Sequence, residues 1–161
     1  MPNDLAGDTP TDKKHKEEHM NSQGGYDIQD LQPGMTASVA KTVTEADIVM
    51  FAGVSTDVNP VHLNEEFAKT TMFKGRIAHG MLSAGFISAV LANKLPGPGT
   101  IYLGQTLKFK APVRPGDTVV ATVTVKELLV DKKRCVLEAV CRVGDTVVIE
   151  GESTMLCTSA S

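Results

Sequence analysis

The sequence predicts an α+β domain in which an antiparallel β-sheet wraps around one long apolar helix. Residues 80–94 carry mostly apolar or small side chains on every face of a helix and contain no carboxylate, so we expect this helix to be buried on all sides. The chain after residue 100 alternates apolar and polar side chains with a period of two, which is typical of antiparallel strands with one covered face. A buried helix followed by such strands favours a helix packed inside a curved sheet.

The size and charge of the chain narrow its function. Its 161 residues favour a single domain with one core. A net charge of −3 and an aromatic content of 4% argue against a nucleic-acid partner. No apolar run approaches the length of a membrane span, and residues 1–5 lack the features of a secretory signal. We therefore expect a cytoplasmic protein without a membrane partner.

The three cysteines have no spacing typical of a metal site. Cys135 and Cys141 share the parity of the apolar positions in their strand, which predicts that both face the core. Together with Cys157 they are expected to be free, reduced thiols rather than disulfide or metal ligands.

The N-terminal residues 1–25 are polar and rich in charge, so we expect a disordered tail before a domain that spans residues 26–161. His15 and His19 have the i, i+4 spacing of a metal-binding pair, but no further ligands stand near them. The sequence therefore favours a solvated tail and no metal site.

The first elements of the domain are marked by capping residues. Residues 35–43 suit a strand, and Thr44 has the features of an N-cap for a helix that runs to about Gly53. Asn64 is expected to cap a second, short helix because two glutamates follow it.

After the central helix, residues 95–99 contain two prolines and two glycines, which should end that helix abruptly. Strands are then expected over residues 101–113, 119–125, 134–143 and 146–157. The residues predicted to share the core face of each strand are Ile101, Leu103, Leu107, Phe109 and Ala111; Val119, Ala121, Val123 and Val125; Cys135, Leu137, Ala139, Cys141 and Val143; and Val147, Ile149 and Met155.

A carboxylate and an imidazole stand five positions apart around a proline. Asn59 and Pro60 disfavour a continuous helix, so an extended or turned loop is expected between Asp57 and His62. Such a loop can direct both side chains at one water molecule, where they would share the transfer of a proton. The alternative is structural: Asp57 forms a local turn and His62 packs or caps.

Gly80 at the start of the long helix also has two interpretations. The absence of a Cβ would allow close contact between helix and sheet. Alternatively, its unpaired N–H and the helix dipole would stabilise negative charge on a substrate oxygen.

Several segments together resemble one family. They are Asp57-Val58-Asn59-Pro60-Val61-His62, His79-Gly80-Met81-Leu82, Ile101-Tyr102-Leu103-Gly104-Gln105 and residues 109–117. In this order and with these gaps they are similar to the MaoC-like, (R)-specific (type 2) enoyl-CoA hydratases, over roughly residues 35–157. The resemblance implies a hotdog fold, a homodimer or higher homo-oligomer, and an acyl-CoA thioester substrate.

The resemblance also implies roles for individual residues. Asp57 and His62 match the catalytic pair, and Gly80 matches the glycine of the oxyanion hole. Ser88 matches a supporting serine near that pair. His79 belongs to the motif without being its general base, and we expect it to fix the loop before the helix.

Two further polar groups have structural explanations. Ser83 lies on the same helix as Ser88 but has no counterpart in the family pattern, so it is interpreted as structural. The structural alternative for Ser88 is a bond to a carbonyl of its own helix, which is usual for a buried serine. Lys108, Lys110 and Arg114 suit either CoA phosphates or a solvated strand face.

The function expected from this pattern is the reversible hydration of trans-2-enoyl-CoA to (R)-3-hydroxyacyl-CoA, with neither a metal nor a cofactor. A (3R)-hydroxyacyl-ACP dehydratase is the alternative with the same chemistry on another carrier. An acyl-CoA thioesterase is disfavoured because residues 80–94 contain no Asp or Glu, and a non-catalytic acyl-binding hotdog subunit because both Asp57 and His62 are present.

The acyl group is expected to be short. A chain that runs along the helix past Ser88 would meet Leu91, with Met155 on the last strand as a lid. Because overpacking a closed pocket is costly, we expect a preference for about four to six carbons.

Overall fold

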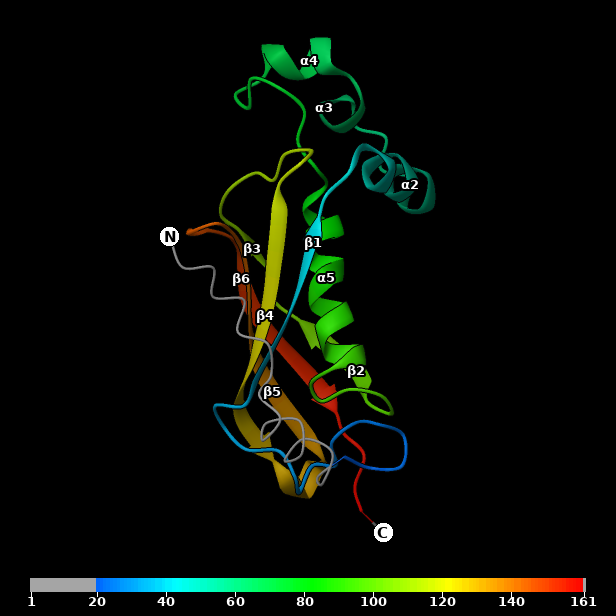
Figure 1. The fold of residues 1–161 in the computed structure, drawn as a ribbon, viewed down its shortest axis with the longest axis vertical. Coiled ribbons are helices and arrows are strands. Elements are labelled where there is room, and N and C mark those ends of the chain that lie inside the picture. Colours follow the sequence, from blue (N-terminus) through cyan, green and yellow to red (C-terminus); the bar gives the residue numbers. More distant parts are fainter. Residues whose placement is uncertain (1–19, 161) are drawn as a thin grey trace, which may run out of the picture.

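The computed structural model describes residues 20–160 and shows a six-stranded antiparallel sheet with a long helix along one face (Figure 1). The sheet order is β1-β4-β5-β6-β2, and β3 also pairs with β6. The strands are β1 (Thr36–Thr42), β2 (Ile101–Gln105), β3 (Lys108–Phe109), β4 (Thr118–Leu129), β5 (Arg134–Val143) and β6 (Thr146–Leu156), and a short 3₁₀ helix, η1 (Val130–Lys132), joins β4 to β5.

Within residues 20–160 four α-helices complete the fold, and α2, α3 and α4 project beyond one end of the sheet (Figure 1). The four helices are α2 (Glu45–Ser55), α3 (Pro60–Leu63), α4 (Glu65–Thr70) and the long α5 (Gly80–Asn93). Thr44 and Asn64 cap α2 and α4 with their side chains, as predicted, and Asp47 completes a capping box at α2. None of the helices within residues 20–160 combines the length and apolar character that a bilayer span requires.

The strand parity read from the sequence places the core correctly in β4 and β5. The predicted inward residues of β4, and Cys135, Leu137, Ala139 and Cys141 of β5, are at most 2% exposed. α5 packs against β4, β1 and β5, and contributes Ile87, Val90 and Leu91 to the same core. The apolar interior therefore lies between α5 and the concave centre of the sheet.

The expectation that α5 is buried on all sides is wrong for the single chain. Ser83, Ala84, Ile87, Val90 and Leu91 are buried, but the opposite face is open and Met81 is 55% exposed. One sheet covers only one side of a helix, so the second apolar side has no cover within this chain.

The predicted strand 101–113 is two short strands, β2 and β3, which both pair with β6 on either side of Thr106. Its N–H bonds the carbonyl of Glu152 at 2.9 Å, and its carbonyl lies against Gly151, where a side chain would not fit. Since β2 is a sheet edge, its predicted core residues Ile101 and Leu103 are 57% and 46% exposed. Phe109 in β3 is 54% exposed as well.

The parity of the last strand is interrupted by a β-bulge. Cys141 pairs with Ile149 while the next residue, Arg142, pairs with Val147, which leaves Val148 as an extra residue. The bulge turns Val148 inward beside Ile149, and each is 1% exposed. The prediction that Val147 faces the core is therefore wrong.

The described structure begins before the predicted domain boundary at residue 26. Asn21 hydrogen-bonds Asp27 at 3.1 Å and Thr158 at 3.0 Å, and the N–H of Tyr26 bonds the carbonyl of Pro96 at 2.8 Å. Residues 21–25 are thus a turn anchored to the domain rather than part of a disordered tail. His15 and His19 lie outside the described residues.

Candidate active site

A cavity of about 440 Å³ opens where α5 begins. Residues from α3, the segment 72–79, the first turn of α5, β3 and β6 line it. The lining residues are Asp57, His62, Met72, Phe73, Ile77, Ala78, His79, Gly80, Met81, Ser83, Phe109, Lys110, Ala111, Pro112, Val113, Val148 and Ile149. The cavity is mostly apolar with a few polar groups, which is typical of a small-molecule site.

The segment that carries His62 is a short helix rather than the predicted loop. Asn59 caps α3 by accepting the N–H of Val61 at 3.2 Å, and Pro60 occupies its first position. Proline is tolerated there because the N–H that it lacks would be unpaired anyway. The helix turns His62 inward, where it is 8% exposed.

His62 and Asp57 face each other across the cavity wall. Nε2 of His62 lies 3.9 Å from Oδ2 of Asp57, a separation that leaves one water molecule room to contact both atoms. Nδ1–H of His62 donates to the carbonyl of Ile77 at 2.8 Å. Since a carbonyl can only accept, the neutral ring carries its proton on Nδ1 and presents a basic Nε2 to Asp57.

His79 has a structural role, as predicted, but it holds the main chain of Asp57 rather than the loop before α5. Its Nε2–H donates to the carbonyl of Asp57 at 2.9 Å. Its ring packs on the ring of His62 with centroids 3.9 Å apart, and the ring centroid of Phe51 lies 4.9 Å from that of His79. His79 is 1% exposed, so it positions both members of the pair from behind.

The N-terminus of α5 lacks the side-chain cap that the other α-helices have. Thr44, Asn59 and Asn64 each accept an N–H of their helices, whereas His79, the N-cap of α5, makes no such bond. The first N–H groups of α5 consequently remain available to an oxygen in the cavity.

Gly80 permits a close aromatic contact at this helix start. A Cβ at this position would lie 2.5 Å from Cε1 of Phe109. The ring therefore packs directly on the main chain of Gly80, and both residues line the cavity.

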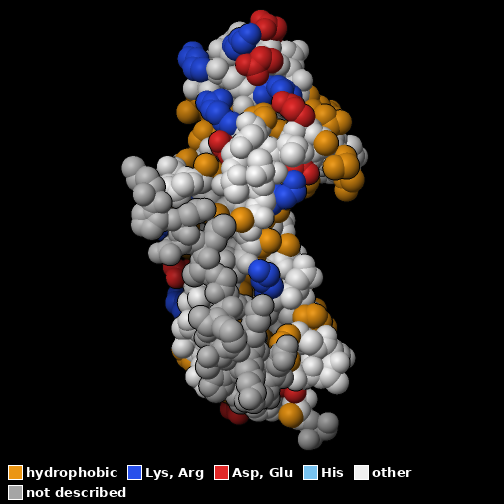
Figure 2. Space-filling model, in the orientation of Figure 1, with side chains coloured by type: hydrophobic (Ala, Val, Ile, Leu, Met, Phe, Trp, Pro, Cys, Tyr) orange, Lys and Arg blue, Asp and Glu red, His pale blue; other side chains and the backbone are white. Residues whose placement is uncertain are grey.

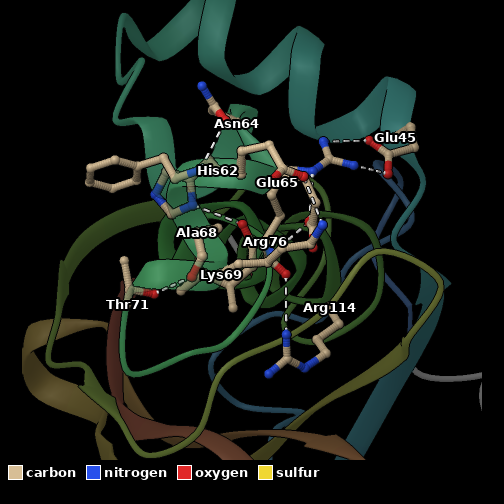
Figure 3. A network of polar contacts seen from close by, with 12 residues as sticks. Glu45, His62, Asn64, Glu65, Ala68, Lys69, Thr71, Arg76 and Arg114 are labelled. Atoms are coloured by element: carbon tan, nitrogen blue, oxygen red, sulfur yellow. Dashed lines mark hydrogen bonds and ion pairs between the residues drawn. The ribbon is translucent and has the colours of Figure 1, made fainter.

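Ion pairs fix the projecting helices to the segment that leads into α5 (Figure 3). Arg76 hydrogen-bonds Glu45 of α2 at 2.9 Å, and its guanidinium lies 3.5 Å from Glu65 of α4. Arg114 donates to the carbonyl of Phe73 at 2.6 Å. The exposed Arg114 side chain is therefore hydrogen-bonded to the main chain of the segment that lines the cavity.

Three of the predicted site residues lie apart from the cavity. Ser88 is half-buried on α5, and Leu91 and Met155 are 1% and 2% exposed in the core. None of the three lines the cavity of the single chain. Lys110 does line it, with its ammonium 3.3 Å from Glu150.

Ser83, which the sequence led us to interpret as structural, lines the cavity. It is 0% exposed, and its hydroxyl has no partner among the described residues, not even a carbonyl of its own helix. The spacing in the sequence could have indicated this position, since residue 83 lies one helical turn after Gly80 and so on the same face of the helix.

A divalent cation would find a set of ligands at the same place. Asp57, His62 and His79 each present one ligand atom, and these atoms lie within 4.8 Å of one another.

The three cysteines are not part of this set of ligands. All three are buried and free, and burial raises the pKa of the Cys141 thiol to about 12.

Comparison with known proteins agrees with this geometry. The family model of the MaoC like domain matches residues 29–152. The chain belongs to the MaoC-like domain family. An (R)-specific enoyl-CoA hydratase from Rhodospirillum rubrum is 61% identical over 129 residues, which cover 80% of this chain and 90% of that protein. A 3-hydroxybutyryl-CoA dehydratase from Methylorubrum extorquens is 50% identical, over 78% of this chain and 80% of the relative.

A solved structure places the fold of this MaoC-like chain. The unliganded R-hydratase PhaJ1 from Pseudomonas aeruginosa superposes with a TM-score of 0.79 at 42% identity, over 84% of this chain and 88% of that one. The predicted hotdog fold, an antiparallel sheet with a long central helix, is confirmed.

The contact between Gly80 and Phe109 predicts a position-specific effect of adding one methyl group. Gly80→Ala should lower kcat/KM at least tenfold, because the Phe109 ring has to move away from the first N–H groups of α5. Gly85→Ala on the same helix is the matched control, since a Cβ there meets nothing within 4 Å. Steady-state kinetics of both variants test this, and equal activities would show that the Gly80 contact has no role.

Proposed function

We propose that this chain catalyses the reversible hydration of trans-2-enoyl-CoA to (R)-3-hydroxyacyl-CoA. One observation carries the proposal: Asp57 and His62 face each other at 3.9 Å beside the uncapped start of α5. The pair supplies a base and an acid, and the helix start supplies hydrogen-bond donors for a thioester oxygen.

The chemistry follows from this placement. A water molecule between Asp57 and His62 loses a proton to the pair while its oxygen forms a bond to C3 of the enoyl group. The C2–C3 π electrons move toward the thioester, whose oxygen gains negative charge. Gly80 N–H and the helix dipole stabilise that charge. A proton from the pair then reaches C2, and the pair returns to its starting state.

The carrier and the reaction class have separate support. The relatives at 61% and 50% identity are named for CoA thioesters, which favours CoA over an acyl carrier protein. A thioesterase of this fold would need a carboxylate on or beside α5, and Gly80–Asn93 contains none. The free, buried cysteines support a reducing compartment, and we propose the cytoplasm.

Purified protein should hydrate crotonyl-CoA without added metal or nucleotide and release the (R) enantiomer. Loss of absorbance of the enoyl thioester, followed by chiral analysis of the product, measures this. Crotonyl-ACP in a parallel assay should react more slowly. An (S) product, or loss of activity with a chelator, would contradict the proposed mechanism.

Asp57→Asn and His62→Ala should each lower kcat by about 10²–10⁴, as expected for the loss of general acid–base catalysis. The double variant should be little worse than either single one, because both groups act on one water. Asp131→Asn, an exposed carboxylate on η1, is the control that should keep full activity. Near-normal turnover in either single variant would refute the role of the pair.

We propose that the chain forms a homodimer. The open face of α5 and the sheet edge β2 expose apolar side chains, among them Met81 and Ile101. Hydrophobic side chains also gather over α2 (Figure 2), where Met50 and Val54 are 61% and 86% exposed. A second copy would cover these surfaces.

Light scattering of the purified protein should therefore give twice the mass of the chain. Ile101→Asp should shift the protein toward monomer, because a charge would be buried at the sheet edge. Val130→Asp is the matched control, since Val130 is 51% exposed on η1. A wild-type monomer at micromolar concentration would contradict the proposed assembly.

The acyl group is proposed to be short, because the cavity has a volume of only about 440 Å³ and buried side chains such as Val148 and Ile149 form part of its wall. Leu91 and Met155 belong to the same core cluster as these wall residues. Leu91→Ala should create space behind these wall residues and so raise the ratio of kcat/KM for C8 enoyl-CoA to that for C4 enoyl-CoA. The substitution should also lower the free energy of unfolding by about 2–5 kcal/mol. Leu31→Ala is the control of equal volume outside the cavity lining. A wild-type optimum at C8 or longer would contradict the short-chain assignment.

A further inference from the structure

Two buried polar atoms in the described chain lack a hydrogen-bond partner, and both belong to residues that line the cavity. They are Nδ1 of His79 and Oγ of Ser83, whose residues are 1% and 0% exposed. Buried polar groups are rarely left unpaired, because the loss of their hydration costs about 1–3 kcal/mol each. Because both residues line the same cavity, one group bound there could serve both atoms.

The hydrogen-bonding capacity of the two atoms is complementary. Nε2–H of His79 is committed to the carbonyl of Asp57 at 2.9 Å, so Nδ1 of the neutral ring can only accept. The hydroxyl of Ser83 can donate, and it does not use the usual carbonyl one turn back along its helix. The two residues lie four positions apart at the start of α5, on either side of Gly80 in sequence.

We infer that Ser83 and His79 are positioning residues that hold one water molecule beneath Gly80, and that this water donates a second hydrogen bond to the thioester oxygen. The inference rests on the proposed function. The water accepts the Ser83 O–H and donates one proton to Nδ1 of His79. Its second O–H points to the substrate oxygen that Gly80 N–H also contacts. No proton is transferred in this arrangement.

The bound water links the oxyanion site to the acid–base pair. The same His79 ring that receives this water also fixes the main chain of Asp57 and stacks on His62. Charge stabilisation at the thioester and the placement of the pair thus depend on one imidazole. A water with two protein partners and one substrate partner satisfies the usual count of two to four.

A non-reacting ligand tests the inference directly. Butyryl-CoA labelled with ¹³C at the carbonyl lacks the double bond, and its C=O stretch reports the hydrogen bonds at the thioester oxygen. The stretch should lie at lower frequency in wild type than in Ser83→Ala. Ser153→Ala is the matched control: this buried hydroxyl donates to Gln105 at 2.5 Å, outside the cavity, so the stretch should match wild type.

Kinetics supply the second readout. Ser83→Ala should lower kcat at least about tenfold and leave KM within about twofold, because the water acts mainly when charge develops on the oxygen. Ser83→Cys keeps a weak donor of similar size and should lie between wild type and Ser83→Ala. Ser153→Ala should keep kcat while losing stability.

The carbonyl stretch separates this inference from the proposed function, because it needs binding but no turnover. Equal stretches in wild type and Ser83→Ala would overturn the inference even if wild type hydrates crotonyl-CoA normally. A crystal structure of wild type in which Ser83 bonds a carbonyl of its own helix would do the same. If Ser83→Ala does not fold, wild type against Ser83→Cys still decides, since equal stretch and equal kcat would overturn the inference.

Discussion

Two hydrogen bonds from imidazole rings to main-chain carbonyls determine what the rest of the site can do. His62 donates from Nδ1 to Ile77, and His79 donates from Nε2 to Asp57. Each bond fixes the neutral tautomer of its ring, and the second also fixes the carboxylate that faces His62. If the His62 ring flipped, Nε2 would no longer offer a lone pair to a water beside Asp57. If the His79 ring flipped, the main chain of Asp57 would lose its hydrogen bond.

The fold supplies these bonds by bringing three separate segments to the start of α5. The α3 helix carries His62, the segment before α5 supplies the Ile77 carbonyl and His79, and Arg76 ties that segment to α2 and α4. β6 closes the cavity from the sheet side through the bulge at Val148. The helix start is left uncapped, which is a local cost that a substrate oxygen would offset.

Local rules predicted much of this arrangement. Period-two alternation located the core faces of β4 and β5, and the capping residues Thr44 and Asn64 located two helix starts. The motif around Asp57 and His62 predicted the pair that the structure brings together at 3.9 Å. These features depend on near neighbours in sequence or on a motif that is itself contiguous.

The predictions that failed depend on distant contacts. Pro60 was interpreted as a helix breaker although it starts α3, where the cap from Asn59 decides the outcome. A helix whose residues are apolar on all sides does not reveal which of its serines lines the cavity, so the sequence does not single out Ser83. One face of α5 and the edge strand β2 are exposed in the single chain. Periodicity in the sequence marks these residues as apolar but does not show whether one sheet or two cover them.

The tautomers of the two histidines test this account most directly. Two-bond ¹H–¹⁵N spectra of the uniformly labelled protein above pH 7.5, with His62→Ala and His79→Ala to assign the signals, report which ring nitrogen carries the proton. We expect a proton on Nδ1 of His62 and on Nε2 of His79. A His62 ring protonated on Nε2 would contradict the account, because the atom that faces Asp57 would then be unable to accept a proton from water.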